Sequence, residues 1–266
     1  ESRLLMVEWK KRIIIGGLPR SGSTLLRWHL DAAKEIVSPP ETTFFQFLLC
    51  TNQERIGGRC RRINKALQLG ESEISNIILS SQTSVEAFDR LMAKWAEKRG
   101  VKASIWAEKT PWNCLSYQWL SNENQEIWFI STIRDGRDVV TSEHWKKNRQ
   151  YHCEIQRYID VMSIIYSFSH ENHIIVSYED LVEDIEGTMK KIFQHIGISW
   201  CKNMIQDAQK EDEFRSALSD RQPMLTKQPD SSRIGRWRED DNEQRITEFL
   251  GNSRAVEWLK RSGYTP

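Results

Sequence analysis

A glycine-rich turn between a short apolar run and an amphipathic segment is the feature that most constrains the fold of this sequence. The turn, GLPRSGSTLL (17–26), follows the three isoleucines at 13–15. Its two glycines and Thr24 match the P-loop pattern G-x-x-x-x-G-K-[ST], but Ser23 stands where the pattern has lysine. Backbone N–H groups at a helix N-terminus bind anions. The stretch therefore predicts a strand, a glycine-rich turn and a helix, in that order, with backbone N–H groups at the turn that suit an anion.

The missing lysine leaves two interpretations of this turn. In one, it is a strand-to-helix connection without a ligand, in which Ser21 or Ser23 caps a helix over 21–36. In the other, it binds a phosphate group through its amides, its three hydroxyls and the guanidinium of Arg20. A second cationic cluster near the turn would favour the second interpretation.

The segment IRDGRDVVTSEHWKK (133–147) supplies such a cluster directly after an apolar stretch. On a helix starting near Asp135, Ser142 would lie two turns along and Lys146 one turn further. With Arg134 at the strand end, these side chains predict a second anion pocket, separate from the first. The alternative is a surface network of arginines and aspartates at a helix start, where the helix dipole favours carboxylates.

Apolar runs and amphipathic segments alternate along the 266 residues, which predicts an α/β fold with a central parallel sheet and helices on both faces. We expect a single domain over residues 1–266. Ligands of such sheets bind at the carboxyl ends of the strands, where Arg20, Arg134 and Tyr178 are expected. The predicted strands cover 12–17, 104–108, 126–133 and 173–179, and the predicted helices cover 21–36, 84–99, 138–147, 155–169, 185–196 and 243–259, the last broken near Gly251.

Composition and charge exclude several classes of function. The net charge of +1 provides no bulk field for nucleic acid, and no apolar stretch approaches the ~20 residues of a membrane-spanning helix. The five cysteines are widely spaced and form no C-x-x-C pair, which argues against a zinc site and against a disulfide framework. We therefore expect a cytoplasmic protein without a bound metal.

Four segments together resemble the sulfotransferases that use 3′-phosphoadenylyl sulfate (PAPS). PRSGSTLL (19–26) resembles their 5′-phosphosulfate loop, and IRDGRDVVTS (133–142) resembles their 3′-phosphate motif. VSYEDL (176–181) is similar to the strand whose tyrosine lies near adenine, and SSRIGRW (231–237) to the late loop that closes over the nucleotide. The four segments occur in family order. The resemblance implies a three-layer fold with the P-loop topology in an enzyme that does not hydrolyse ATP. Such an enzyme needs neither the P-loop lysine nor Mg²⁺.

The resemblance also implies which residues bind the nucleotide. PAPS would be the co-substrate and 3′,5′-ADP the product, with no metal in the site. The implied nucleotide-binding residues are Arg20, Ser21, Gly22, Ser23, Thr24, Leu25, Arg134, Ser142, Lys146, Tyr178, Gly235 and Arg236.

The stretch IWAEKTPWN (105–113) distinguishes branches of the family, because it lacks the catalytic histidine of the cytosolic steroid and phenol enzymes. Arg20 and Lys109 instead resemble the tyrosylprotein and the bacterial natural-product sulfotransferases, whose base is a glutamate after the first helix. SPPETTFF (38–45) places Glu41 there. The resemblance thus implies Glu41 as the base, with Arg20 and Lys109 stabilising charge on the sulfuryl oxygens and the leaving phosphate. The alternative for Glu41 is the first turn of a helix, where glutamate is favoured.

We therefore expect transfer of a sulfuryl group to a hydroxyl, or an amine, of a small-molecule acceptor. A tyrosylprotein sulfotransferase is the alternative. A kinase or NTPase with a degenerate P-loop and a non-catalytic binder of PAPS or 3′,5′-ADP are more remote. Residues 71–100 and RIGGRCRR (55–62) are expected to shape the acceptor side.

The resemblance predicts activity without a metal, because Arg20, Lys109 and the loop amides would supply the positive charge that Mg²⁺ supplies in ATP-using P-loop enzymes. Sulfate transfer from PAPS should be unchanged in excess EDTA. Activity that EDTA abolishes and Mg²⁺ restores would instead favour the kinase.

Overall fold

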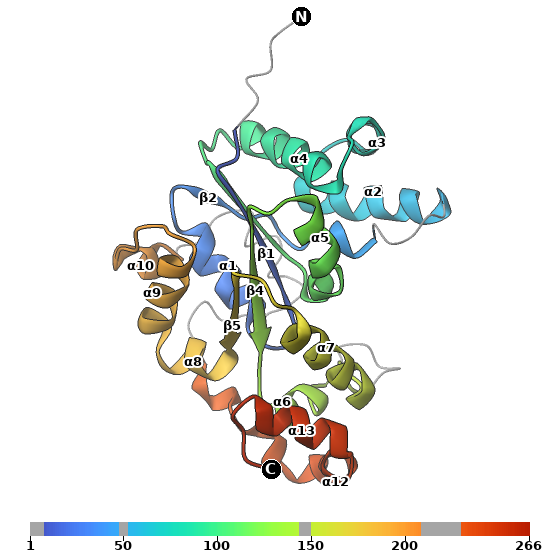
Figure 1. Cartoon of the computed structure of the whole chain (residues 1–266), viewed down its shortest axis with the longest axis vertical. Coiled ribbons are helices and arrows are strands. Elements are labelled where there is room, and N and C mark those ends of the chain that lie inside the picture. The colour runs from blue at the N-terminus through green and yellow to red at the C-terminus, as the bar shows by residue number, and fades with distance from the viewer. Residues whose placement is uncertain (1–7, 48–52, 144–149, 209–229) are drawn as a thin grey trace, which may run out of the picture.

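One parallel sheet forms the centre of the molecule (Figure 1). The computed structural model describes residues 8–47, 53–143, 150–208 and 230–266. The strands of the sheet pair in the order β2-β3-β1-β4-β5, and each of these pairings is parallel. Their bounds are β1 (Lys11–Gly17), β2 (Ile36–Val37), β3 (Ile105–Lys109), β4 (Ile127–Ile133) and β5 (His173–Ser177).

Helices connect and cover these strands. The α-helices are α1 (Ser23–Asp31), α2 (Gln53–Leu67), α3 (Glu71–Ser80), α4 (Ser84–Lys98), α5 (Tyr117–Glu123), α6 (Gly136–Val140), α7 (Ile155–Ser167), α8 (Tyr178–Glu183), α9 (Ile185–His195), α10 (Asn203–Ala208), α12 (Glu243–Leu250) and α13 (Ser253–Arg261). Short 3₁₀ turns are η1 (Phe45–Phe47), η2 (Pro111–Ser116), η3 (Ser231–Arg233), η4 (Arg236–Arg238) and η5 (Asp240–Asn242). Within the described ranges, no helix is long and apolar enough to cross a membrane.

The isoleucines of β1 show why the chain forms three layers. Ile13, Ile14 and Ile15 are fully buried, as expected for a strand that helices cover on both faces. Successive side chains of a strand point to opposite faces. Ile14 accordingly packs into one core with side chains of α4, α5 and α7, and its two neighbours pack into the other with side chains of α1, α8 and α9. Figure 1 shows the two groups of helices on either side of the sheet. The predicted α/β fold with a parallel central sheet is confirmed.

The predicted elements agree with the structure where the apolar periodicity extends over a long segment. Helices α4, α7 and α9 match the segments expected at 84–99, 155–169 and 185–196, and the C-terminal helix is broken at Gly251, between α12 and α13. The first helix is shorter than predicted: α1 ends at Asp31, and residues 36–37 form strand β2. The last strand also ends earlier than predicted, because the hydroxyl of Ser177 accepts the amide of Asp180 and caps α8.

The helix predicted over 138–147 is wrong over residues 141–143, and residues 144–147 lie outside the described residues. It ends at Val140, where Thr141 donates its hydroxyl to the carbonyl of Arg137 (2.7 Å). The amide of Thr141 donates to the same carbonyl (3.1 Å), so both bonds close the last turn of α6. The chain then forms an antiparallel bridge at Glu143. Ser142 therefore follows the helix instead of lying on it.

The serine cap predicted for the first helix is also wrong. Gly22 precedes α1 with a left-handed φ of 78°, and no side chain caps the helix there. Ser21 instead donates its hydroxyl to the carbonyl of Leu18 (2.5 Å) and bonds to the hydroxyl of Thr132 (2.6 Å). This serine holds the turn against β4 rather than capping the helix.

Gly22 is predicted to tolerate no side chain. A Cβ there would meet Cδ2 of Tyr178 at 2.8 Å, and a φ of +78° is strained for any L residue. Gly22→Ala should therefore destabilise the fold by about 2–4 kcal/mol, the combined effect of left-handed strain and overpacking. Urea unfolding measures this loss.

Gly100→Ala is the matched control for this substitution. Gly100 has a φ of +64°, but a Cβ there would meet nothing within 4 Å. It should cost only the strain, about 1–2 kcal/mol. Equal losses in the two variants would show that Tyr178 does not restrict the turn.

Candidate functional site

The turn between β1 and α1 (18–22, the β1–α1 turn) is fixed by its contact with β4. The amide of Leu18 donates to the carbonyl of Thr132 (3.0 Å). A Cβ at Gly17, whose φ is +131°, would overlap that carbonyl, so the approach of the two strands requires glycine. Arg20 adopts a left-handed φ of 66°. This conformation is uncommon for residues with a side chain and is concentrated at functional sites.

The first turn of α1 follows directly and presents backbone donors. The first helical hydrogen bond of α1 runs from the amide of Leu26 to the carbonyl of Gly22 (3.0 Å). The preceding helical amides have no partner within the helix. They belong to the predicted residues Ser23, Thr24 and Leu25. The sequence-predicted donors therefore stand together at the carboxyl end of β1.

The two predicted anion pockets are in contact with each other instead of being separate. Nε of Arg20 donates to the hydroxyl of Ser142 (3.1 Å), and Nη1 of Arg134 donates to the carbonyl of Arg20 (3.0 Å). This contact is possible because α6 ends early and the chain turns back at Ser142. Lys146, predicted for the same pocket, lies outside the described residues.

Arg134 is the centre of the cluster. Its side chain is only 9% exposed, and its guanidinium lies 4.4 Å from the centroid of the Tyr178 ring. Nη2 donates to Oδ2 of Asp138 (3.1 Å) and to the carbonyl of Arg233. The buried Nε has no partner. Such an unsatisfied buried donor is costly, and it indicates a site for an additional acceptor.

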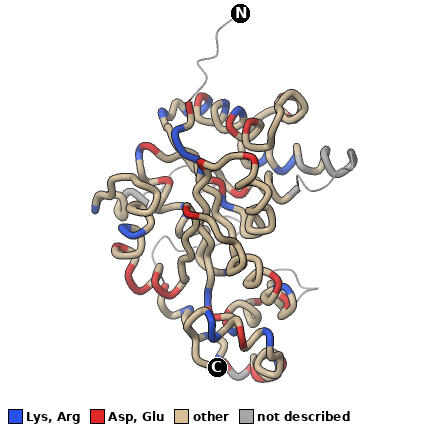
Figure 2. The backbone as a smooth tube through the Cα atoms, in the orientation of Figure 1, with Lys and Arg blue, Asp and Glu red and all other residues tan. Residues whose placement is uncertain are grey.

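The charges of this cluster do not cancel. Burial, followed by the like charges of Arg233 and Arg134, lowers the pKa of Arg20 below its ordinary value. The Nε of Arg20 bonds to a neutral hydroxyl, whereas Arg134 and Arg233 pair with Asp138 and with Asp230. These pairs do not balance the charge of Arg20, which favours binding of an anion here. Charge elsewhere is mixed in sign, since basic and acidic segments alternate along the chain in Figure 2.

Asp138 is a site residue that the sequence analysis missed. Its carboxylate is fully buried and accepts the amides of Gly235 (2.8 Å) and Trp237 (2.9 Å) in addition to Arg134. One carboxylate thus joins α6 to the late loop (231–237). Its position four residues after Arg134 was the available signal, because side chains at this spacing meet on a helix.

The late loop contributes a different arginine from the one predicted. Gly235 lies in it as expected, with a left-handed φ of 77°. The side chain of Arg236 is 51% exposed and pairs with Glu239 (2.9 Å), so the structure does not bring it to the cluster. Arg233 approaches instead, through its carbonyl and its charge.

Glu41 and Lys109 form a second centre at the same edge of the sheet. Nζ of Lys109 lies 2.7 Å from Oε2 of Glu41. The lysine side chain is 7% exposed at the end of β3, next to Ile15 of β1 in register, whereas the glutamate is 41% exposed. Glu41 precedes η1, which begins at Phe45, by four residues, so the helix-turn alternative for it is wrong. The structure therefore brings the two predicted residues together.

The backbone before Glu41 is held by α1. Nη1 of Arg27 donates to the carbonyls of Ser38 (2.9 Å) and Pro39 (3.2 Å). The amide of Ser38 donates to Oδ1 of Asp31 (2.7 Å), and its hydroxyl donates to the carbonyl of Ala107 (2.6 Å). These contacts direct the chain from the first helix across the end of β3.

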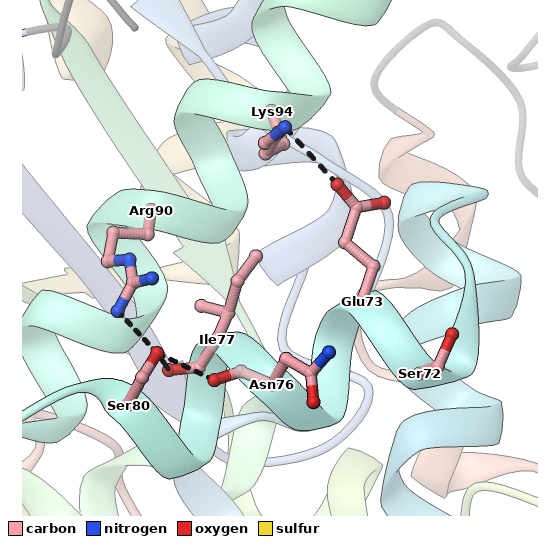
Figure 3. Close-up of a pocket in the computed structure, with 7 residues that line it drawn as sticks. All are labelled: Ser72, Glu73, Asn76, Ile77, Ser80, Arg90 and Lys94. Atoms are coloured by element: carbon pink, nitrogen blue, oxygen red, sulfur yellow. Dashed lines mark hydrogen bonds and ion pairs between the residues drawn. The ribbon is translucent and has the colours of Figure 1, made fainter. Parts of the chain in front are cut away.

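A cavity of about 450 Å³ lies elsewhere, on α3 and α4 (Figure 3). Its charged side chains are engaged locally: Lys94 pairs with Glu73 (3.4 Å), and Arg90 donates to Ser80 (2.9 Å). In Figure 1, α3 and α4 lie toward the end of the sheet opposite α6. The expected role of residues 71–100 at the acceptor side stays a prediction. Among the described residues, no group of three or more His, Cys, Asp or Glu side chains could hold a metal.

Comparison with known proteins gives a consistent picture. A model of the sulfotransferase family matches residues 12–202. The chain is 28% identical over 205 residues to protein-tyrosine sulfotransferase 2 of Gallus gallus, covering 73% of this chain and 53% of that protein. It therefore spans about half the length of the curated relatives it matches.

Two solved structures share the fold. The sulfotransferase domain of the Synechococcus PCC 7002 olefin synthase has a TM-score of 0.59 at 17% identity, covering 96% of this chain and 95% of that one. The sulfotransferase domain from the curacin biosynthetic pathway has a TM-score of 0.58 at 16% identity, covering 96% and 98%.

Proposed function

Because the chain belongs to the sulfotransferase family, we propose that it transfers the sulfuryl group of PAPS to a hydroxyl, or an amine, of an acceptor and releases 3′,5′-ADP. The observation that carries this proposal is the convergence of Arg20, Ser142 and Arg134 beside the open N-terminus of α1. An ATP-type P-loop has its cation on a lysine within the loop, whereas here Arg20 and Arg134 lie together beside the turn, which suits a second phosphate.

The residues at the edge of the sheet fit this nucleotide. The amides of the first turn of α1 suit the 5′-phosphosulfate, since a helix N-terminus stabilises negative charge. The unpartnered Nε of Arg134 and the hydroxyl of Ser142 suit the 3′-phosphate. Tyr178 supplies an aromatic face within the same cluster.

The second centre supplies the groups that the transfer needs. The acceptor oxygen forms a bond to sulfur while the bond from sulfur to the 5′-phosphate oxygen breaks, and the acceptor proton passes to Glu41. The exposed part of the Glu41 carboxylate is open to an acceptor while its Oε2 contacts Lys109. Lys109 and Arg20 oppose the negative charge that develops on the sulfuryl group and the leaving phosphate. Such reactions depend mainly on positioning and electrostatic stabilisation.

The acceptor class has two candidates. A small molecule is our proposal, and a protein tyrosine is the second candidate because relatives at 28% identity are named protein-tyrosine sulfotransferases. Assays with labelled PAPS against alcohols, phenols, amines and acidic tyrosine peptides separate the two. Turnover of ATP with Mg²⁺, without sulfate transfer, would overturn the proposal. A cytoplasmic location stays a prediction.

The assignment of the 3′-phosphate pocket predicts a preference between nucleotides. 3′,5′-ADP should bind more tightly than 5′-AMP by about 1.5–3 kcal/mol, the usual contribution of a charged hydrogen-bonded contact. Arg134→Ala should reduce this difference, because 3′,5′-ADP should lose more affinity than 5′-AMP does. Arg90→Ala, in the cavity on α4, is the control and should retain the preference. Calorimetry measures the affinity of each of the three proteins for both nucleotides, and equal binding of the two nucleotides to the wild type would contradict the assignment.

The role of Glu41 predicts a loss of rate without a loss of fold. Glu41→Gln keeps the shape of the side chain and removes the base, so kcat should fall by about 10²–10⁴-fold. Affinity for 3′,5′-ADP and thermal stability should stay near wild type, as they should in the exposed control Glu71→Gln. A Glu41→Gln variant that keeps more than about a third of wild-type kcat, with chemistry shown to limit the rate, would exclude Glu41 as the base.

A further inference from the structure

Glu108 is a fully buried carboxylate in the residue preceding Lys109. Its Oε1 accepts the amide of Thr42 (3.2 Å), the hydroxyl of Thr42 (2.7 Å) and the hydroxyl of Thr110 (2.8 Å). Its Oε2 accepts Nδ2 of Asn113. Burial raises the pKa of Glu108, and the hydrogen bonds from Asn113 and the two threonines oppose that rise. The proposed transfer reaction gives no role to the Glu108 carboxylate.

The two threonine hydroxyls extend the reach of Glu108 along the backbone. The amide of Phe44 donates to the hydroxyl of Thr42 (3.1 Å), and the amide of Thr43 donates to the hydroxyl of Thr110 (3.1 Å). A hydroxyl that accepts from an amide directs its single proton elsewhere, here to Glu108. Three consecutive amides, those of residues 42, 43 and 44, therefore depend on one carboxylate, either directly or through one hydroxyl.

The anchored segment holds an unfavourable conformation. Thr43 has a φ of 57°, in the left-handed region that β-branched residues rarely adopt. Such conformations persist only where the surroundings determine them. Next to it, the ring of Phe44 packs against Phe88 with centroids 5.0 Å apart. With Arg27 fixing the carbonyls before Glu41, the segment is held on both sides of the proposed base.

We propose that Glu108 is a positioning residue that holds Glu41 against Lys109 by anchoring the backbone of residues 42–44. Successive residues of β3 act on one segment: Lys109 contacts the Glu41 side chain, and Glu108 fixes the backbone that follows it. Strand alternation sends their side chains to different surroundings, which explains why Glu108 does not pair with its neighbouring lysine. The proposal rests on the proposed function only in so far as Glu41 is the base.

Two substitutions test the anchor. Glu108→Gln removes the negative charge and can place the new side-chain NH₂ group against the NH₂ group of Asn113. Thr110→Val removes the hydroxyl that links the amide of Thr43 to Glu108, and it keeps Glu108 itself. Glu123→Gln is the matched control, because Glu123 also accepts two amides and a hydroxyl, from Ser84 and Val85, at the start of α4. Each of the three variants should lose hydrogen bonds, but only Glu108→Gln and Thr110→Val should displace Glu41.

Hydrogen exchange tests the anchoring without any reference to activity. The amides of residues 42–44 in Glu108→Gln, and that of Thr43 in Thr110→Val, should exchange at least about tenfold faster than in wild type. They should not change in Glu123→Gln. Unchanged exchange in a folded Glu108→Gln variant would overturn the proposal, and Thr110→Val provides the same test if Glu108→Gln does not fold.

Kinetics test whether the anchor acts through Glu41. Glu108→Gln and Thr110→Val should lower kcat by about 10–100-fold, the effect of a misplaced reacting group, with 3′,5′-ADP affinity nearly unchanged. In a Glu41→Gln background, the same substitutions should change kcat by less than about twofold, since coupled residues are not additive. A full further loss in that background would overturn the proposal. Wild-type kcat in Glu41→Gln alone would overturn the proposed base, and the exchange rates distinguish that result from a failure of Glu108.

Discussion

The buried ion pair between Arg134 and Asp138 connects more of the site than any other described contact. Through Arg134 it reaches the carbonyl of Arg20 and the ring of Tyr178, and through Asp138 it holds two amides of the late loop. Strands β1, β4 and β5 are thereby joined beyond their carboxyl ends. Removing one partner of such a pair leaves an uncompensated buried charge, which typically costs about 3–5 kcal/mol. The arrangement of Arg20, Tyr178 and the late loop around Arg134 therefore depends on this pair.

The cation cluster around Arg134 and the Glu41–Lys109 pair follow different strands of the sheet. The cation cluster follows β1, β4 and β5, whereas Glu41 and Lys109 belong to the end of β3 and to the segment that crosses it. The β1–α1 turn is bounded by both, because β1 pairs with β3 on one side and with β4 on the other. Parallel register brings these strand ends to one edge of the sheet. A ligand lying across the β1–α1 turn would reach both centres, which is the arrangement that group transfer from a nucleotide requires.

Sequence periodicity predicted the architecture because buried parallel strands and long amphipathic helices carry a strong local signal. It failed at α6, which ends at Val140, so that Ser142 contacts Arg20 instead of lying on the helix. The roles of Glu41 and Lys109 came from the family resemblance and not from spacing. Their ion pair, between residues 68 apart, was not predicted. The contacts of Asp138 with the late loop and of Glu108 with Thr42 likewise join distant segments and have no local pattern. Predicting that Arg233 and not Arg236 lies beside Arg134 likewise requires the path of the late loop. The two arginines are three residues apart, and their order in the sequence does not specify that path.

The structure also bears on the phosphotransferase alternative through the position of its charges. In an ATP-using P-loop, a lysine in the loop contacts the phosphates, and an aspartate after a neighbouring strand helps to hold Mg²⁺. Here the lysine position is Ser23, which is buried at the start of α1, and the cation of the turn is Arg20, directed toward Ser142. Asp135, the first carboxylate after β4, is engaged with Nε and Nη2 of Arg137 (3.0 and 2.8 Å). The positive charge of the turn therefore lies on the side where α6 ends and not inside the loop. The first carboxylate after β4, that of Asp135, already pairs with an arginine. This arrangement suits a ligand with a second phosphate beyond the turn better than a triphosphate chelating a metal beside it.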